Sequence, residues 1–278
     1  MKKTKERGMD FHVNLYGCGQ MAQAIFRGLA KDPKGPRNFT LHTYTPSYTK
    51  AFELAQHLGG KAYRDLNQLP SSPYHFLALK PQQFGDLSQN LAPLLSPKAI
   101  AVSIMAGIGL GTIKESLGLE KAIRVMPNTP CRVGRGVSLM VCSPEVTERE
   151  RDQMASLFKG VSVVMACQNE DQLDRAMAVS GCGPAYLFEK ASILEDYLQT
   201  HGFSPESSAT IVRELFMGSS LLLSESDESP STLCRRVASK GGATEKALHL
   251  LKEKDLKEIM NLAMDRAYER AKELAKGQ

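Results

Sequence analysis

Short β-rich runs alternate with helical patterns over the first 166 residues of the chain. The β-rich runs combine branched and aromatic side chains and stop at glycine, proline or polar residues, as strands do. They cover residues 11–16, 39–44, 74–79, 100–104, 122–126, 137–142 and 161–166. Apolar residues at helical spacing predict helices over 21–30 and 48–58. This order of elements predicts an α/β fold built on a mainly parallel, doubly wound sheet.

The pattern changes near residue 167, after which helices follow one another with little β signal. The predicted helices cover residues 171–179, 184–202, 205–224 and 245–274. In the last of them, apolar residues recur at helical spacing from Leu256 to Leu274. We therefore expect a flexible leader over residues 1–8, an α/β domain over 9–167 and an all-helical domain over 168–278. The long apolar helices of the last domain are expected to bury against a second chain.

Composition narrows the class of protein. No apolar run approaches the ~20 residues that cross a bilayer, and none follows the charged start as in a secretory signal. The net charge of +5 is spread along the chain, which does not favour nucleic acid as a partner. The six cysteines lack any C-x-x-C pair, so we expect no metal site and buried thiols in a reducing cytoplasm.

A phosphate-binding motif lies between the first strand and the first helix. The pattern G-x-G-x-x-A is formed by Gly17, Cys18, Gly19, Gln20, Met21 and Ala22. The first glycine permits a tight turn, the second lets the backbone approach a pyrophosphate, and the small last residue lets helix and strand pack closely. The start of the helix adds N–H groups and partial positive charge. We predict a Rossmann-like domain that binds a dinucleotide here; the alternative is an ordinary βα turn.

The end of the second strand bears on which nicotinamide dinucleotide binds. An acidic residue there would hold the ribose 2′-hydroxyl and repel a 2′-phosphate, but no acid occurs before Glu53. The hydroxyls of Thr45 and Ser47, together with the Lys50 cation, tolerate a 2′-phosphate. The pattern therefore favours NADP(H), with NADH left open.

Three later segments end the third, fourth and fifth strands. Ligands of open α/β sheets bind outside the carboxyl ends of the strands, so these segments could line one crevice, although each alone is also an ordinary strand end. The third is Arg124–Pro130, and the cofactor-binding candidates in the first two are Ala78, Leu79, Lys80, Pro81, Ala106 and Gly107.

Two C-terminal segments complete a pattern with a known counterpart. Residues 180–186 (SGCGPAY) resemble the signature S-G-S-G-P-A-Y, and residues 239–244 (SKGGAT) resemble S-P-G-G-[AT]-T. Together with the glycine motif and the V-K-P-, A-G-I- and R-V-M-P-N-T-P-like segments, they follow in order from about residue 11 to 274. In this the chain resembles the pyrroline-5-carboxylate reductase family.

The resemblance implies an enzyme that reduces 1-pyrroline-5-carboxylate to L-proline with NADPH or NADH, the last step of proline biosynthesis. It also implies a Rossmann domain followed by a helical domain that interlocks in a homodimer, with further assembly to a decamer. The family's substrate loop maps onto Ser239, Gly241, Gly242, Ala243 and Thr244. There the serine and backbone amides hold the carboxylate, while Thr244 contacts the ring nitrogen and is the catalytic candidate.

The residues of this loop also support an anion site on their own terms. Ser239, Gly241 and Gly242 can present successive N–H groups as a concave nest, and Thr244 is expected to cap the helix that follows. A plain glycine turn with a capping threonine is the alternative. Because a C=N bond already accepts hydride readily when it is protonated, the enzyme needs orientation more than a strong acid.

The sequence departs from the family pattern at three places. Thr45-Pro46-Ser47 replaces N-R-[ST], so the usual arginine for a 2′-phosphate is missing. Lys240 replaces the proline of the substrate loop, and Cys182 replaces a serine.

Two other functions remain open. One is a reductase of the same build acting on another cyclic imine or a β-hydroxyacid. Hydroxyacid dehydrogenases of this build typically use a catalytic lysine on a helix of the second domain; Lys190 is the only comparably placed lysine and is interpreted as a helix-surface charge. The other is a dinucleotide-binding regulator without turnover, which would not need the loop at 239–244.

Overall fold

The computed structural model describes residues 10–31 and 38–275. Its contacts divide the chain into two compact units, Met1–Gly181 with Ala267–Gln278, and Cys182–Arg266. Helix α6 (Glu170–Ser180) is grouped with the first unit, so this division falls after α6, whereas the sequence places the domain boundary before it. The leader predicted over residues 1–8 lies outside the described residues.

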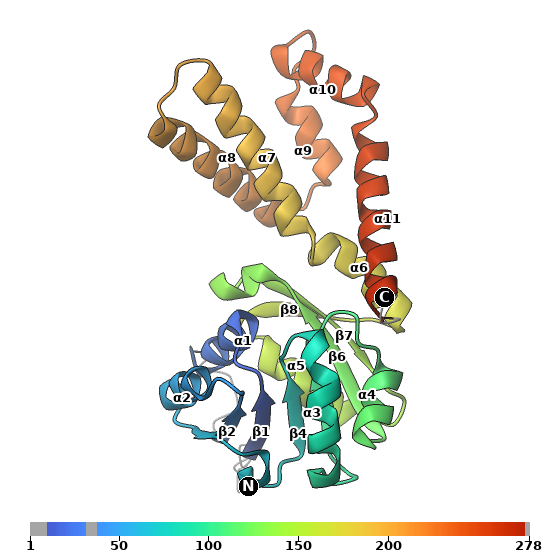
Figure 1. Cartoon of the computed structure of the whole chain (residues 1–278). Coiled ribbons are helices and arrows are strands. Elements are labelled where there is room, and N and C mark those ends of the chain that lie inside the picture. Colours follow the sequence, from blue (N-terminus) through green and yellow to red (C-terminus); the bar gives the residue numbers. More distant parts are fainter. Residues whose placement is uncertain (1–9, 32–37, 276–278) are drawn as a thin grey trace, which may run out of the picture. The chain divides into compact units, whose positions relative to one another are not determined.

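The first unit is built on one eight-stranded sheet in the order β3-β2-β1-β4-β5-β6-β7-β8 (Figure 1). Neighbouring strands are parallel except β6 and β7, which are antiparallel. The doubly wound α/β prediction is therefore confirmed, while the short β3 was not predicted. The strands are β1 (Asp10–Tyr16), β2 (Asn38–Tyr44), β3 (Lys61–Tyr63), β4 (Tyr74–Leu77), β5 (Ile100–Ser103), β6 (Lys121–Pro127), β7 (Gly136–Cys142) and β8 (Ser162–Ala166).

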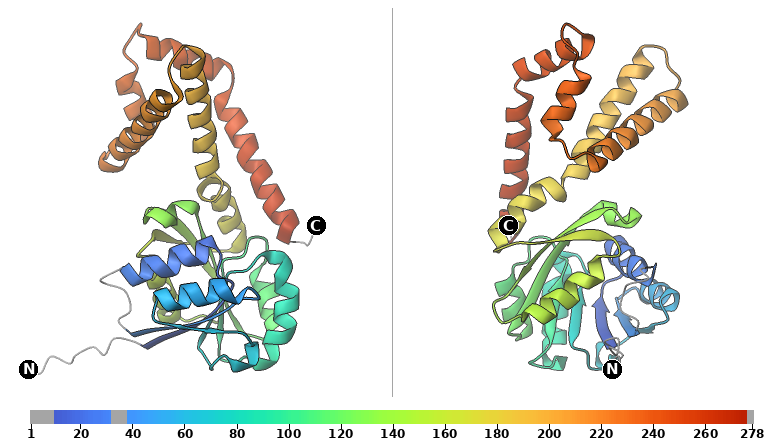
Figure 2. Two further views of the ribbon diagram at one scale, coloured as in Figure 1. Left: turned by 60° about the vertical axis from the view of Figure 1, so that its left-hand side comes forward. Right: turned by 180° about the vertical axis from the view of Figure 1, so that it is seen from behind.

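Helices cover both faces of this sheet and bury two large apolar clusters, beside a smaller third one between β6, β7 and α6. One cluster joins the sheet to α1 (Gln20–Lys31), α2 (Tyr48–His57) and α5 (Glu148–Phe158). The other joins it to α3 (Phe84–Leu91) and α4 (Leu110–Leu117). The two views of Figure 2 show these helices against the sheet. Strands buried on both faces are typical of parallel sheets, and β4 and β5 are accordingly buried at every position.

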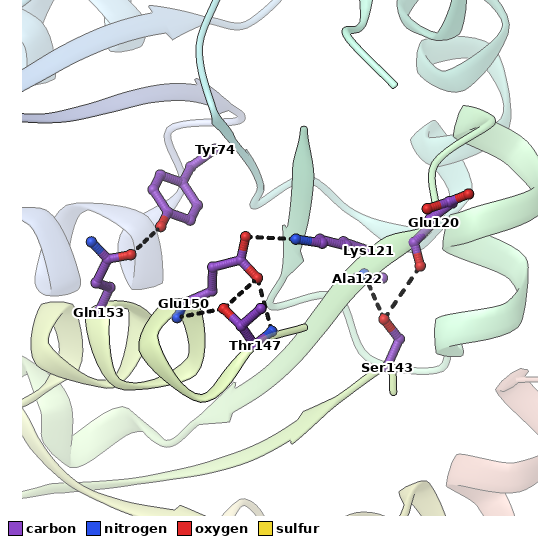
Figure 3. Close-up of polar contacts among 8 residues, drawn as sticks. All are labelled: Tyr74, Glu120, Lys121, Ala122, Ser143, Thr147, Glu150 and Gln153. Atoms are coloured by element: carbon purple, nitrogen blue, oxygen red, sulfur yellow. Dashed lines mark hydrogen bonds and ion pairs between the residues drawn. The ribbon is translucent and has the colours of Figure 1, made fainter. Parts of the chain in front are cut away.

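Polar contacts fasten α5 to the amino-terminal ends of β4 and β6 (Figure 3). Thr147 caps α5, because its hydroxyl accepts a hydrogen bond from the amide of Glu150 at 3.3 Å. The Glu150 carboxylate in turn accepts from the Thr147 amide at 2.8 Å and pairs with the ammonium of Lys121, the first residue of β6, at 2.7 Å. A second link between α5 and the sheet is the hydrogen bond that the Tyr74 hydroxyl donates to Oε1 of Gln153 at 2.8 Å. The reciprocal hydrogen bonds of Thr147 and Glu150 form a capping box, which sets where α5 begins.

Replacing Thr147 by alanine is expected to lower the free energy of unfolding by about 1 kcal/mol, because the Glu150 amide loses its acceptor at the start of the helix. Urea denaturation of the full chain measures the change. Thr147→Ser keeps the hydroxyl and is expected to stay near wild type. Equal stability of the alanine variant and the wild type would show that the cap contributes nothing.

The second unit is helical, as predicted. Its elements are α7 (Gly183–Thr200), α8 (Pro205–Glu225), α9 (Pro230–Val237), α10 (Ala243–Glu253) and the first part of α11 (Leu256–Ala275). Helix α9 was missed by the sequence pattern. Among the described helices, none combines the length and apolar character that crossing a membrane requires.

The prediction of one helix over 245–274 is wrong. The chain breaks between α10 and α11 at Lys254 and Asp255, and Asp255 adopts a positive φ of 51°. Aspartate is one of the few residues other than glycine that enter the left-handed region readily. The apolar periodicity on either side conceals this break, because both helices present apolar residues at the same spacing.

The cysteines are all free thiols. Cys18 and Cys131 are buried and three others are partly buried, but Cys234 is exposed, so the expectation of buried thiols is wrong for that residue.

Candidate cofactor and substrate sites

The glycine loop joins β1 to α1 through a backbone turn that only glycine fits at its first position. Gly17 has φ 91°, and a Cβ there would stand 2.5 Å from the carbonyl oxygen of Ala78 at the end of β4. Its amide donates to the carbonyl oxygen of Tyr44 at 2.9 Å. The loop is thereby held against the ends of β2 and β4 at once.

The second and third small residues of the motif differ in what surrounds them. A Cβ on Gly19 would meet no protein atom within 4 Å, so packing inside the protein does not require glycine there. Its open surface suits the close approach of a ligand to the backbone. Ala22 is buried and belongs to the core cluster under α1, with Met21 packed against the same cluster. These two residues anchor the loop to the hydrophobic core.

A cavity of about 540 Å³ opens beside this loop. Ligand pockets commonly enclose roughly 300–1,000 Å³. The predicted cofactor-binding residues that line it are Gly17, Cys18, Gly19, Thr45, Ser47, Ala78, Leu79 and Lys80. The structure thus brings three separate strand ends, those of β1, β2 and β4, to one cavity, as parallel strands require.

Other predicted residues lie outside this cavity. Gln20 lines a neighbouring cavity of about 1,090 Å³, and Pro81 begins the short 3-10 helix η2 (Pro81–Gln83). Ala106 is exposed, whereas Gly107 is buried with φ 73°, and a Cβ on it would stand 2.9 Å from the Cβ of Leu274. Gly107 therefore has a packing reason to be glycine, and its contact with a cofactor stays a prediction.

Sequence reasoning missed several residues that line the cavity. Leu66 follows the unpredicted strand β3, and Leu87 and Asn90 lie on α3, which the pattern also left unassigned. None of them belongs to a strand-end motif. The helical spacing of Phe84, Leu87 and Leu91 was the available signal.

The residue before the glycine loop belongs to a buried pair. The Tyr16 hydroxyl lies 2.8 Å from Nδ1 of His75, whose Nε2 lies 3.0 Å from the carbonyl oxygen of Ser72. Because a carbonyl only accepts, Nε2 carries the proton and Nδ1 accepts from Tyr16. Burial lowers the pKa of His75 to about 4 and raises that of Tyr16. Burial also raises the pKa of the Cys18 thiol to about 12, which disfavours the nucleophilic thiolate at neutral pH.

The predicted substrate loop lies in the second unit, before α10. Gly241 has φ 73°, and the amide of Gly242 donates to the carbonyl oxygen of Ser239 at 2.9 Å to close the turn. A Cβ on Gly242 would stand 2.5 Å from Oγ of Ser239. The positive φ of Gly241 favours glycine there, whereas a Cβ on Gly242 would crowd Ser239.

The same loop corrects the expected cap. Gly242 occupies the capping position of α10 in an extended conformation, and Thr244 is the second residue inside the helix, so the prediction that Thr244 caps it is wrong. The amide of Gly241 donates to the Glu245 carboxylate at 2.7 Å, which engages one N–H of the expected nest. The first amides of a helix have no partner within that helix, so α10 offers those of Ala243 and Thr244 instead.

Comparison with known proteins supplies the deciding observation. A family model described as pyrroline-5-carboxylate reductase dimerisation matches residues 170–274, and one described as NADP oxidoreductase, coenzyme F420-dependent, matches residues 12–107. The pyrroline-5-carboxylate reductase of Staphylococcus aureus is 32% identical over 264 residues, which cover 92% of this chain and 96% of that protein. The chain belongs to the pyrroline-5-carboxylate reductase family.

Solved structures agree with this membership. The pyrroline-5-carboxylate reductase of Coxiella burnetii superimposes with a TM-score of 0.85 at 28% identity, over 95% of this chain and 98% of that one. The Plasmodium falciparum pyrroline carboxylate reductase, solved with NADP bound, gives 0.80 at 27% identity, over the same shares of each chain. The resemblance inferred from the sequence motifs is confirmed, and with it the reductase class.

The R-V-M-P-N-T-P-like segment of this reductase family member ties elements of the first unit together. The buried Arg124 pairs through Nη1 with Glu170 at 2.5 Å and through Nη2 with Asp174 at 3.1 Å. Glu170 also accepts from the Leu110 amide, so the network joins β6, α6 and the start of α4. Desolvation by burial raises the pKa of Asp174 against the opposing effect of Arg124.

Asn128 of the same segment also joins neighbouring elements through its side chain. Its Nδ2 donates to the carbonyl oxygen of Ser180 and its Oδ1 accepts from the Val137 amide, both at 2.9 Å. The side chains of Arg124 and Asn128, in this strand-end segment, thus hold α6 and β7 in place. Among the described residues, no three His, Cys, Asp or Glu side chains gather as a metal site would require.

Proposed function

We propose that the chain reduces 1-pyrroline-5-carboxylate to L-proline by hydride transfer from NADPH. One observation carries the proposal: an open dinucleotide cavity beside a G-x-G-x-x-A turn, in a chain that also keeps the substrate-loop signature of its family. The family match over residues 12–107 to an NADP oxidoreductase model supports the cofactor class.

The residues around the cavity fit such a cofactor. The open face of Gly19 and the amides at the start of α1 suit the pyrophosphate, since the helix adds partial positive charge there. Thr45, Ser47 and Lys50 line the side where the adenosine ribose would lie, without an acidic residue in the first turn of α2. The strand-end segments from Ala78 to Pro81 and at Ala106 and Gly107 are assigned to the nicotinamide half.

The substrate would be held by the loop before α10. Ser239 and the amides at the start of that helix bind the carboxylate, and the Thr244 hydroxyl forms a hydrogen bond with the ring nitrogen. When bound, NADPH would supply a hydride to C5 of the protonated C=N bond, whose π electrons would become the lone pair of the ring nitrogen. The chain's part is to orient the ring and exclude competing poses.

Turnover distinguishes this function from the alternatives. NADPH oxidation is followed by absorbance with pyrroline-5-carboxylate and, separately, with the six-membered piperideine-6-carboxylate. We expect turnover with the five-membered ring at the higher kcat/KM. A preference for the larger ring indicates a related imine reductase. Turnover with neither overturns the proposed function and leaves the β-hydroxyacid reductase and the dinucleotide-binding regulator.

Thr244→Ala is expected to lower kcat/KM for pyrroline-5-carboxylate by roughly 10- to 100-fold, because one hydrogen bond at a reacting atom is lost. The Kd for NADPH, measured by fluorescence titration, should stay near wild type. Thr244→Ser keeps the hydroxyl and is expected to retain most of the activity. Unchanged turnover in the alanine variant would remove Thr244 from the mechanism.

The remaining assignments concern assembly and location. Residues 170–274 match a dimerisation model, and α7 and α8 leave large apolar side chains exposed in the single chain, among them Phe188, Tyr197 and Leu222. These support a homodimer formed through the helical domain predicted over 168–278. Further assembly to a decamer is what the family resemblance implies. We place the enzyme in the cytoplasm.

A further inference from the structure

An arginine stands at the end of the edge strand β3. The guanidinium carbon of Arg64, the residue after that strand, lies 3.8 Å from the centroid of the Tyr48 ring. The side chain is exposed, and among the described residues no carboxylate forms an ion pair with it. Stacking on the ring fixes the plane of the guanidinium and leaves its N–H edge free.

The sheet register places this arginine beside the turn that follows β2. Tyr44 and Tyr63 are partners in the parallel β2–β3 ladder, so Thr45 and Arg64 leave the sheet next to each other. Neighbouring strands lie about 4.8 Å apart. Thr45 and Ser47 on one side, and Leu66 on the other, line the cavity beside the glycine loop. Arg64 does not itself line the cavity, but it leaves the sheet next to Thr45 and two positions before Leu66, which do, and so it lies close to the adenosine end.

The surroundings suit a doubly charged anion. Ser47 occupies the capping position of α2 without a side-chain hydrogen bond to the helix, and the first turn of α2 contains no acidic residue. Lys50 lines the cavity from the same turn. A guanidinium matches a phosphate with two parallel N–H donors, which an ammonium cannot do.

We propose that Arg64 binds the 2′-phosphate of NADP(H), taking the place of the arginine that is absent at the end of β2. It thereby selects NADPH over NADH. The inference rests on the proposed cofactor cavity, and it assigns the selectivity to a strand that the sequence pattern did not reveal.

Direct binding of two cofactor fragments to the full chain tests the proposal. Isothermal titration compares 2′,5′-ADP with 5′-AMP, which differ only in the 2′-phosphate. In Arg64→Gln we expect the Kd for 2′,5′-ADP to rise by about 10-fold or more, with the Kd for 5′-AMP within about twofold of wild type. Arg64→Lys keeps the positive charge but loses the paired N–H donors of the guanidinium. Its Kd for 2′,5′-ADP should lie between those of the wild type and Arg64→Gln.

Lys61→Gln is the matched control, since it removes the same charge from the opposite end of β3 and is expected to change neither Kd. Equal weakening of both fragments would show that Arg64 stacks on the adenine, which overturns the proposal, as would unchanged binding of 2′,5′-ADP. If the wild type binds neither fragment, the proposed cofactor cavity itself fails. With whole cofactors, the ratio of kcat/KM for NADPH to that for NADH should fall in parallel.

Discussion

Gly17→Ala is expected to abolish detectable NADPH binding and to lower the free energy of unfolding by about 3 kcal/mol. An L-residue in the left-handed region costs roughly 1–2 kcal/mol, and the new Cβ would stand 2.5 Å from the carbonyl oxygen of Ala78, so the turn must also shift. A shifted turn loses the hydrogen bond to Tyr44 and moves the amides that would face the pyrophosphate.

Urea denaturation and calorimetric titration with NADPH measure the two effects. Gly59→Ala is the matched control, because Gly59 also has a positive φ, 68°, but a Cβ there would meet no atom within 4 Å. It should cost about 1 kcal/mol from backbone conformation alone and leave NADPH affinity unchanged. A Gly17→Ala protein with wild-type stability and affinity would contradict the geometry of the loop.

Arg124→Met is expected to lower the free energy of unfolding by about 3–5 kcal/mol, because it leaves Asp174 and Glu170 without their cation in a largely buried network. Since burial already raises the pKa of Asp174, the cost of its charged form grows when Arg124 is lost. The destabilisation should therefore be full at pH 7 and shrink as acid protonates Asp174.

A second substitution separates the charge effect from packing. In Arg124→Met/Asp174→Leu, the most buried unpaired carboxylate is gone, and most of the lost stability should return. Glu170 keeps its hydrogen bond from Leu110 and is partly exposed, so it needs no replacement. If the double variant were less stable than Arg124→Met, the loss of stability would come from side-chain packing and not from an unpaired buried charge.

How far the sequence predicts this molecule depends on how local the determining contacts are. The glycine turn, β1 and α1 are set by residues close together in the chain, and their prediction is confirmed. The sequence pattern does not predict the break between α10 and α11, because one residue in the left-handed region, Asp255, leaves the apolar spacing on both sides intact. The three residues of β3 are too few to show any period.

The same difference between local and distant contacts holds for the candidate site. Thr45, Ala78 and Gly17 could be placed together, because parallel strands end at one edge of a sheet. The partners of Arg124 lie 46 and 50 positions away on α6, and the ring beneath Arg64 lies on α2. Nothing in the local pattern reveals such contacts, since only the register of the sheet and the packing of the helices bring them about.

The buried pair of Tyr16 and His75 has a consequence for how the enzyme responds to acid and base. With the pKa of His75 near 4 and that of Tyr16 raised, neither side chain changes its charge across the neutral range. This pair, directly before the glycine loop, therefore stays neutral between about pH 5 and 9. A change in cofactor affinity over that interval therefore does not originate from the charge of Tyr16 or His75.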